Sequence, residues 1–333
     1  MKILVTGARS LLLGNVARAL HERGDEVVCL QRKKAEFAGS DDVQQFLADI
    51  RDIDAVTKAL EGCDAVIHGA AKVGVVGTRK EFHEINVEGT ANVLLASHSN
   101  DVHRFVHVST PSVAHAGSAI VGALAEPAVV GRNGSFYAET KAIAEKMVLA
   151  ANSSHMGTVA IRPHLVWGPG DEQLVGRIVE RARQGRLVIV GSGSALVDAT
   201  YIDNAVTALV AAVDATTPGA TCAGNAYVIA NGEPRTVREL MQGICVAADV
   251  SFSPRHVPMT IAVKIGSAME RVWPQLHLGE PPLTRFVAEQ LGTAHWFDPR
   301  PARNDLNWAP HVTMDDGFVH LKQWFTARNV YNR

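Results

Sequence analysis

The sequence predicts an α/β fold, in which a doubly wound parallel sheet is followed by a second, smaller C-terminal lobe. Three observations support this prediction. Short apolar runs alternate with helical patterns through the first half of the chain, which is typical of βαβ units. The first of these runs leads directly into a glycine turn. Beyond residue 171 the pattern becomes less regular, and proline and bulky side chains become more frequent, as in "WPQLHLGEPPLTRF" at 273–286.

The apolar runs predict the strands of the sheet, because each is short and is bounded by turn-forming or polar residues. The first run, "ILVTG", reads as a buried strand. In chain order the predicted strands are 3–7, 26–30, 44–50, 65–71, 104–110 and 159–163.

Helices are predicted between these strands. The first has apolar residues at helical spacing up to Leu20 and ends at Gly24, a natural C-terminal stop. The second is capped by Asp52, because an aspartate side chain can accept hydrogen bonds from the first free amide groups. A long helix runs through 84–97, and another starts near Tyr137.

Composition excludes several classes of function. The 333 residues suffice for one large α/β unit or two lobes that share a cleft. A formal net charge of −2 without a long basic run argues against a nucleic-acid partner. Four scattered cysteines without a C-x-x-C pair suit reduced thiols in a cytoplasm better than disulfides or zinc. The histidines include no H-x-x-x-H pair on a recognisable helix, so no metal is predicted.

No targeting or membrane segment is predicted. Met1-Lys2 leads straight into a strand, which is neither a signal peptide nor an anchor. The most apolar later stretch, 257–273, is interrupted by Lys264, Glu270 and Arg271, so it is too short and too charged to cross a bilayer. We therefore expect a cytoplasmic protein without a transmembrane segment.

The glycine turn "VTGARSLLLG" is an altered form of the loop that cradles the phosphates of a dinucleotide. Gly7 supplies the tight turn, but Ser10 and Leu13 stand where a second and a third glycine usually fall. Ser10 is small and has a hydroxyl donor, and Gly14 is placed to take over the packing role of the third glycine. A purely structural turn is the alternative.

The residues after the second strand predict which dinucleotide binds. A site for NAD usually has an acidic residue here, whereas this chain has "LQRKK" with Arg32, which suits the 2′-phosphate of NADP(H). Arg9 lies in the glycine turn and could reach the same phosphate. Asp49 and Ile50 follow the third strand, where they could contact adenine. A solvated turn rich in charge is the alternative explanation of the basic residues.

The segment "YAETK" predicts the chemistry. Tyr137 and Lys141 are four residues apart, so their side chains lie on one face of a helix. A nearby ammonium group is expected to lower the pKa of a tyrosine and make it a proton donor to a carbonyl oxygen. Ser109 and Thr110 end a strand at the edge of the sheet where such a donor would act. Either hydroxyl could instead only cap the turn that follows.

Together these residues resemble the extended short-chain dehydrogenase/reductases, over nearly the whole chain. The motifs that carry the resemblance are "VTGARSLLLG", "DIRD", "VIHGAA", "NVEGT", "VSTPSVAH", "YAETK" and "RPHLVWGPG". The resemblance implies a Rossmann fold, Tyr137 as proton donor, Lys141 as its activator and ribose ligand, and Thr110 as the catalytic hydroxyl. The residues expected to bind NADP(H) are Gly7, Arg9, Ser10, Leu11, Arg32, Asp49, Ile50, Ala70, Tyr137, Lys141 and Pro163. His164, Leu165 and Val166 follow Pro163 in the expected nicotinamide pocket.

The resemblance also divides the chain into two parts. Residues 1–167 and 201–231 are expected to form the NADP(H)-binding Rossmann domain. Residues 168–200 and 232–333 are expected to form the substrate-binding lobe.

Within that superfamily the chain resembles the 3-beta-hydroxysteroid dehydrogenase-like group. It lacks the asparagine that nucleotide-sugar enzymes have shortly after the strand ending at Arg162. "YIDNAVTALVAA" and "PPLTRFVAEQLGTAHWFD" are most similar to the 2-alkyl-3-oxoalkanoate reductases of bacterial long-chain olefin biosynthesis. This resemblance implies NADPH-dependent reduction of a β-keto acid with two long alkyl arms, which needs a large apolar cavity and a cation for the carboxylate.

Candidates for substrate contacts come from both parts of the chain. The polar candidates are Ser109, His115, Arg285 and His295. The candidates for the wall of an acyl channel are Leu283, Phe286, Val287, Leu291, Trp296 and Phe297. Apolar residues at helical spacing are more often core than ligand wall, so a core role is the alternative for these.

Two other functions stay open at this point. A 3-beta-hydroxysteroid (sterol) dehydrogenase would have the same catalytic core, and a non-catalytic NADP(H)-binding sensor would explain the missing glycines. The resemblance also leaves room for a homo-oligomer and for association with other enzymes of the olefin pathway.

Overall fold

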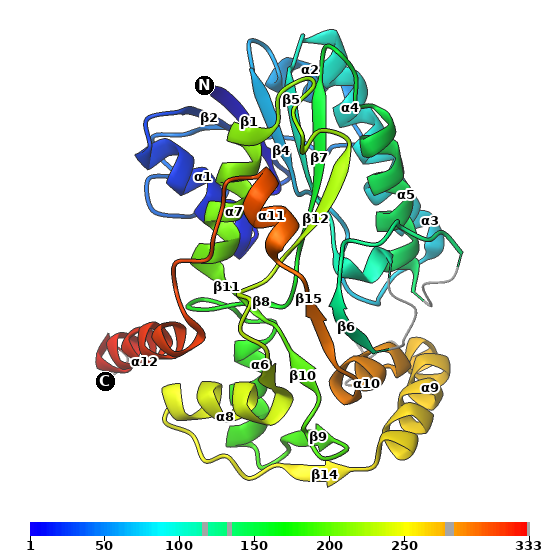
Figure 1. Ribbon diagram of the computed structural model, residues 1–333, viewed down its shortest axis with the longest axis vertical. Coiled ribbons are helices and arrows are strands. Elements are labelled where there is room, and N and C mark those ends of the chain that lie inside the picture. Colours follow the sequence, from blue (N-terminus) through cyan, green and yellow to red (C-terminus); the bar gives the residue numbers. More distant parts are fainter. Residues whose placement is uncertain (115–118, 132–134, 277–282, 332–333) are drawn as a thin grey trace.

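A computed structural model describes residues 1–114, 119–131, 135–276 and 283–331. Within these ranges, the central sheet has seven strands in the order β12-β7-β5-β4-β1-β2-β3, and every neighbouring pair is parallel (Figure 1). The strands are β1 (Lys2–Thr6), β2 (Glu26–Gln31), β3 (Gln44–Leu47), β4 (Ala65–His68), β5 (Arg104–Val108), β7 (Gly157–Pro163) and β12 (Asn225–Ile229). The order runs outward in both directions from β1, so the predicted doubly wound α/β fold is confirmed.

Helices cover both faces of this sheet, which is why the inner strands consist mainly of buried apolar residues. In β1, Ile3 and Val5 belong to one core and Leu4 to the other, and all three are fully buried. The first core contains residues of α1 (Leu11–Glu22) and α7 (Ile202–Ala215). The second contains residues of α2 (Ile53–Ala59), α4 (Gly89–Ser99) and α5 (Phe136–Ala150).

The helix predicted over 84–97 is part of a longer helical segment with an irregular middle. It begins with α3 (Arg79–His83), continues through the π-helical turn η1 (Glu84–Glu88) and ends with α4. The extra residue of a π turn changes the direction of nearby side chains. Here the turn carries Asn86, whose Nδ2 donates hydrogen bonds to the Lys72 carbonyl and to Thr140 Oγ1 of α5. The turn therefore fastens the helix to the loop after β4 and to α5.

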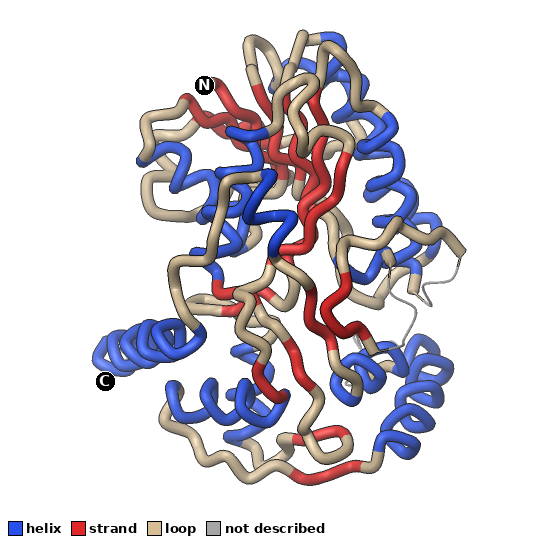
Figure 2. The backbone as a smooth tube through the Cα atoms, in the orientation of Figure 1, coloured by secondary structure: helices blue, strands red, loops and turns tan. Residues whose placement is uncertain are grey.

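The second lobe lies beyond the carboxyl ends of the central strands (Figures 1 and 2). Its four-stranded sheet has the order β13-β10-β15-β6, and β14 pairs with β9 beside it. These strands are β6 (Ile120–Ala123), β9 (Val188–Val190), β10 (Leu196–Val197), β13 (Arg235–Thr236), β14 (Arg255–Val257) and β15 (His295–Phe297). Its helices are α6 (Val175–Arg183), α8 (Val237–Ala247), α9 (Met259–Leu276) and α10 (Arg285–Gly292). The short pair β8 (Val166–Trp167) and β11 (Thr200–Tyr201) joins the two parts.

Two segments pack across the predicted domain boundaries. Strand β6 pairs with β15, although residues 1–167 are expected in the nucleotide-binding part. Helix α11 (Arg300–Asp305) packs on β12, where Tyr227 donates a hydrogen bond to Asp305 over 2.7 Å. The last helix, α12 (Met314–Tyr331), packs against α8 at the side of the second lobe (Figure 1). The domain boundaries remain a prediction. In the structure, β6 packs with the substrate-binding lobe and α11 packs with the nucleotide-binding domain.

Two general features bear on the environment of the protein. All four cysteines are buried free thiols. Among the described residues, no helix combines the length and the apolar character that a bilayer crossing requires.

Candidate active site

The glycine turn between β1 and α1 has the backbone shape that its motif predicts. Gly7 has a φ of +84°, in the left-handed region that glycine adopts most easily. A Cβ atom at this position would lie 3.0 Å from the backbone N and Cα of Ala70. Gly7 and Ala70, which are both predicted cofactor residues, are therefore packed backbone against backbone at the ends of two neighbouring strands.

The missing glycines have a structural explanation. Ser10 is the N-cap of α1, and its Oγ accepts a hydrogen bond from the Leu13 amide. Leu13 packs on Gly69, where a Cβ would come within 2.8 Å of the leucine side chain. A Cβ on Gly14 would lie 2.9 Å from the Ala8 carbonyl oxygen, so Gly14 is the glycine that allows close packing here. The turn keeps the shape of a phosphate-binding loop, and a dinucleotide fits it.

The adenine end of the predicted site contains an ion pair that the sequence analysis missed. Arg9 and Arg32 are exposed, and Ile50 packs against Gly89 of α4. The Asp49 carboxylate accepts hydrogen bonds from Nε and Nη2 of Arg51, each over 3.0 Å. These hydrogen bonds, together with the charge of Arg32, lower the pKa of Asp49. Asp49 is thus held by its neighbour two residues later in "DIRD".

Thr110 and Tyr137 are in direct contact. Thr110 follows β5, where its Oγ1 caps the short 3₁₀ turn η2 (Pro111–Val113). The same side chain is hydrogen-bonded to Tyr137, which lies in the first turn of α5. The Thr110 hydroxyl therefore both caps η2 and contacts the Tyr137 phenol. Burial raises the pKa of Tyr137 to about 12, and the hydrogen bond from Thr110 only partly opposes this.

The expectation that Lys141 lowers the pKa of Tyr137 is wrong for this structure. The Lys141 ammonium donates one hydrogen bond to the Val108 carbonyl, with a distance of 2.7 Å, and another to His107 Nε2, with a distance of 3.0 Å. Both acceptors belong to β5, so the ammonium is directed toward the sheet. Burial lowers the pKa of Lys141 to about 7, although the charge of Glu145 raises it. The pKa of Tyr137 is thus governed by its burial rather than by the lysine.

Ser109 has a different partner from the one predicted. Its hydroxyl donates to the Glu145 carboxylate over 2.6 Å, inside the protein. The same carboxylate forms a buried ion pair with Arg162. Nε of Arg162 donates to Glu145 Oε2 at a distance of 2.8 Å, and Nη2 donates to Oε1 at a distance of 2.5 Å. Arg162 also donates to the Glu126 carbonyl. This network joins β5, α5 and β7 just below Thr110, Tyr137 and Pro163, and the sequence analysis did not find it.

The predicted nicotinamide pocket follows β7. Residues Val108 and Ile161 are partners in the β5–β7 ladder, so Thr110 and Pro163 lie at similar heights on adjacent strands. Leu165 has a φ of +43°, an unusual conformation for a residue with a side chain. Such positions persist only where the surrounding structure holds them.

The polar substrate candidates are not gathered in one place. His295 is buried, and its ring centroid lies 6.1 Å from that of His164, beside the predicted nicotinamide pocket. Arg285 is exposed at the start of α10, where its Nε donates to Glu289 over 2.7 Å. His115 lies outside the described residues. Of the two described residues, His295 is the one that lies close to the end of β7.

The proposed wall of an acyl channel has mixed surroundings. Leu283 and Leu291 pack on a small core of Val190, Ala262 and Ala288, which favours a core role for both leucines. The Phe297 ring contacts the His164 ring edge-on at 5.2 Å between centroids. Trp296 packs over Gly122 of β6. The side chains of Phe286 and Val287 lie outside the described residues.

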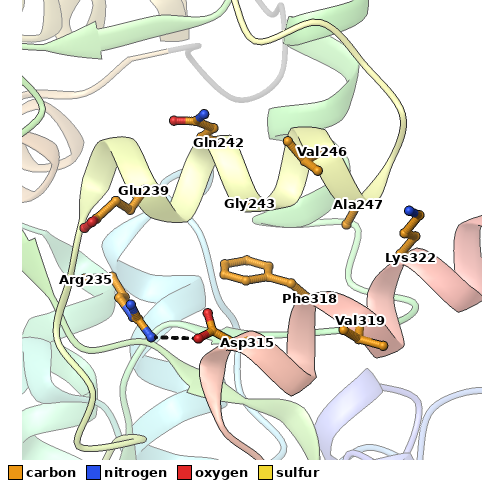
Figure 3. A pocket seen from close by; sticks show the side chains of 10 residues that line it. All are labelled: Arg235, Glu239, Gln242, Gly243, Val246, Ala247, Asp315, Phe318, Val319 and Lys322. Carbon is orange, nitrogen blue, oxygen red and sulfur yellow. Dashed lines mark hydrogen bonds and ion pairs between the residues drawn. The ribbon is translucent and has the colours of Figure 1, made fainter.

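A separate surface cavity of about 430 Å³ lies between α8 and α12 (Figure 3). Phe318 packs into it over Gly243, and Arg235 pairs with Asp315 at one end. None of the predicted site residues is among its lining residues.

Comparison with known proteins identifies the family of this chain. Residues 8–256 match the 3-beta hydroxysteroid dehydrogenase/isomerase family. The chain belongs to this family. It is 47% identical over 325 residues to a 2-alkyl-3-oxoalkanoate reductase of Stenotrophomonas maltophilia (strain K279a), covering 97% of this chain and 98% of that protein. It is 29% identical to a 3-beta-hydroxysteroid dehydrogenase of Mycolicibacterium neoaurum, over 98% of this chain and 91% of that protein.

Solved structures confirm the fold of the family. A dTDP-glucose 4,6-dehydratase from Streptomyces venezuelae, solved with NAD and DAU bound, aligns with a TM-score of 0.75 at 23% identity. The alignment covers 99% of this chain and 98% of that one. The family and its relatives make this protein an NAD(P)-dependent oxidoreductase of the short-chain dehydrogenase/reductase type, and its reductase relatives support a ketoreductase role.

Proposed function

We propose that this protein reduces the 3-oxo group of a long-chain 2-alkyl-3-oxoalkanoic acid to a hydroxyl group, with NADPH as cofactor and Tyr137 as proton donor. The proposal includes a role in bacterial long-chain olefin biosynthesis, in the cytoplasm. The observation that carries it is the arrangement of Thr110, Tyr137 and Lys141, in which a hydroxyl contacts a phenol and a buried ammonium lies one turn along α5. The similarity to a 2-alkyl-3-oxoalkanoate reductase supports the substrate class.

The residues of the chain have distinct parts in this proposal. When bound, NADPH supplies the hydride that adds to the 3-oxo carbon. Tyr137 gives its phenolic proton to the oxygen of the same carbonyl group, which becomes the hydroxyl. Thr110 orients the carbonyl through its hydroxyl, and Lys141 holds the nicotinamide ribose. With a pKa raised to about 12, Tyr137 is protonated at neutral pH, which is the form that reduction requires.

Turnover of a defined acid tests the substrate class. Because 3-oxo acids lose carbon dioxide readily, the reverse reaction is the better assay, with a 2-alkyl-3-hydroxyalkanoic acid and NADP⁺. We expect reduced cofactor to form with an acid that has two long alkyl arms. The methyl ester of the same acid is the matched control and should react more slowly, because it lacks the carboxylate that a cation would bind. No turnover with any such acid would contradict the proposal.

A 3-beta-hydroxysteroid dehydrogenase is the second candidate, favoured by the family and by the similarity to the Mycolicibacterium enzyme. Oxidation of a 3-beta-hydroxysterol with NAD⁺, without turnover of the hydroxy acids, would decide for it. Tight NADPH binding without turnover of either class would instead indicate a non-catalytic sensor.

The preference for NADPH is proposed to depend on Arg32. A charge-assisted hydrogen bond contributes about 1.5–3 kcal/mol, so Arg32→Ala should weaken NADPH binding about tenfold to hundredfold. NADH lacks the phosphate, so its affinity should change little. Lys34→Ala is a matched control with a smaller expected effect, because the Lys34 ammonium is paired with Asp41 at 2.8 Å. Fluorescence titration of the parent and of both variants with NADPH and with NADH gives all six dissociation constants. An equal loss for both cofactors in Arg32→Ala would exclude recognition of the 2′-phosphate.

The proposal extends to partners. A product with two long alkyl arms dissolves poorly in water, so we expect direct transfer to another enzyme of the olefin pathway, and a homo-oligomer would be compatible with this.

A further inference from the structure

A buried imidazole that the proposed reaction does not use lies against the catalytic lysine. His107 is on β5, three residues before Thr110, and its side chain is fully buried. Its Nε2 accepts a hydrogen bond from Lys141 Nζ over 3.0 Å. The next residue, Val108, accepts a second hydrogen bond from the same ammonium through its carbonyl, over 2.7 Å. Adjacent residues of one strand therefore hold the lysine from two directions.

These contacts determine the state of the ring. Burial and the charge of Lys141 lower the pKa of His107 well below its usual range, so the ring is neutral. Since Nε2 accepts from the ammonium, the single ring proton must be on Nδ1. Within the described part of the chain, Nδ1 has no hydrogen-bond partner. A buried donor without an acceptor destabilises the folded protein, and an apolar side chain of similar size would avoid this cost.

The number of donors on the lysine indicates what His107 does. An ammonium group has three N–H donors. His107 and Val108 take two of them. We propose that His107 is a positioning residue that fixes the Lys141 ammonium against β5, so that one N–H is left to bind the cofactor ribose beside Tyr137. This inference rests on the proposed function, in which Lys141 is the ribose ligand.

The charged and titratable groups around the pair are few among the described residues. Glu145 lies one turn beyond Lys141 on α5, and its charge supports the ammonium. His68 of β4 lies beside His107, with 5.5 Å between ring centroids, and burial lowers its pKa to about 3. Tyr137 lies one turn before Lys141 and is protonated at neutral pH. His68 and Tyr137 are thus neutral near pH 7, so an effect on Lys141 that appears when His107 is replaced can be assigned to that residue.

Cofactor affinity as a function of pH tests the proposal. In the parent protein, binding of NADP⁺ should weaken as the pH rises through about 7, where Lys141 loses its proton. His107→Leu removes one acceptor of the ammonium, so the midpoint of this change should fall by about one to two pH units. His107→Gln keeps an acceptor oxygen, so its midpoint should stay within a few tenths of a unit of the parent midpoint, a shift of about 0.3 units at most.

Several results would overturn the inference. A midpoint in His107→Leu that equals the parent midpoint would leave His107 with a packing role only. The same would follow if His107→Gln shifted the midpoint as far as His107→Leu. If His107→Leu does not fold, His107→Asn replaces it, because the shorter side chain cannot reach Lys141 Nζ. The titration needs no substrate, so its outcome is independent of whether a keto acid is turned over.

Discussion

Tyr137→Phe is expected to lower kcat by a factor of about 10²–10⁴, the usual contribution of a positioned proton donor. The substitution removes only the phenolic oxygen, so the ring still fills its place beside Thr110. NADPH should bind with nearly the same affinity, because the ammonium of Lys141 is held by His107 and Val108 and not by the tyrosine. Steady-state oxidation of the hydroxy acid with NADP⁺, in which Tyr137 takes back the proton that it gives in reduction, measures kcat, and a fluorescence titration of NADPH measures the affinity.

A remote tyrosine provides the control for this substitution. The hydroxyl of Tyr227 donates to Asp305 at the far edge of the sheet, so Tyr227→Phe should leave kcat unchanged. A Tyr137→Phe enzyme with nearly full kcat would show that the proton comes from another group. Loss of NADPH binding in the same variant would show instead that the phenol has a role in holding the cofactor.

Arg162→Met is expected to destabilise the protein by about 3–5 kcal/mol, because it leaves the Glu145 carboxylate buried without its cationic partner. Both side chains of this pair are almost fully buried, at 2% and 1% exposure. In the described part of the chain, the Ser109 hydroxyl would then be the remaining side-chain hydrogen-bond donor to the carboxylate. Urea unfolding monitored by far-ultraviolet circular dichroism measures this loss of stability, which should appear as a lower urea midpoint.

Two further variants separate the buried charge from other effects of the substitution. The double variant Arg162→Met with Glu145→Leu removes both charges and should recover much of the lost stability, since buried ion pairs are often replaceable by apolar residues. Lys34→Met breaks an exposed pair, with 61% and 85% exposure, and should leave the urea midpoint nearly unchanged because solvent screens the two charges. A loss in the double variant as large as in Arg162→Met would show that the network matters for its hydrogen bonds and shape, not for charge balance.

Six of the seven strands that the described residues form in the central sheet could be predicted from the sequence, because most of them are short apolar runs, whereas β12 was missed. The predicted strand ends are less accurate at the carboxyl edge of the sheet, where the candidate site residues lie. Strand β4 ends at His68 rather than residue 71, because the Gly69 and Ala70 amides turn to donate to Thr6 Oγ1. Strand β3 ends at Leu47, before the turn that carries Asp49. The predicted strand ends are therefore wrong at the carboxyl edge of the sheet, where the backbone turns out of the ladder.

The second lobe could not be predicted in the same way. Its sheet pairs β6 with β15, two short strands that are far apart in the sequence. No local pattern encodes such a partner, and strands of two to four residues are too short for their periodicity to be seen.

Site residues could be predicted where they belong to a sequence motif. They could not be predicted where their role depends on contact with a residue far away in the sequence. "YAETK" identifies Tyr137 and Lys141, but helical spacing alone cannot show that the ammonium lies on β5. The partners His107 and Glu145 have no motif of their own, because their roles depend on packing between β5, α5 and β7. A buried acidic residue two turns after the tyrosine, facing an arginine that ends a strand, is a signal that could have identified the ion pair.

The contact between Leu13 and Gly69 ties two distant positions of the chain to each other. The Leu13 side chain occupies the space next to Gly69, so only one of these two positions can carry a bulky side chain. A glycine at position 13 or a glycine at position 69 would each leave the room that the other residue needs. Relatives with a leucine at the first position are therefore expected to keep glycine at the second, whereas those with a glycine in the loop are free to vary there. A search that only counts glycines in the loop would classify such proteins as unable to bind a dinucleotide. A search that considers positions 13 and 69 together would include them.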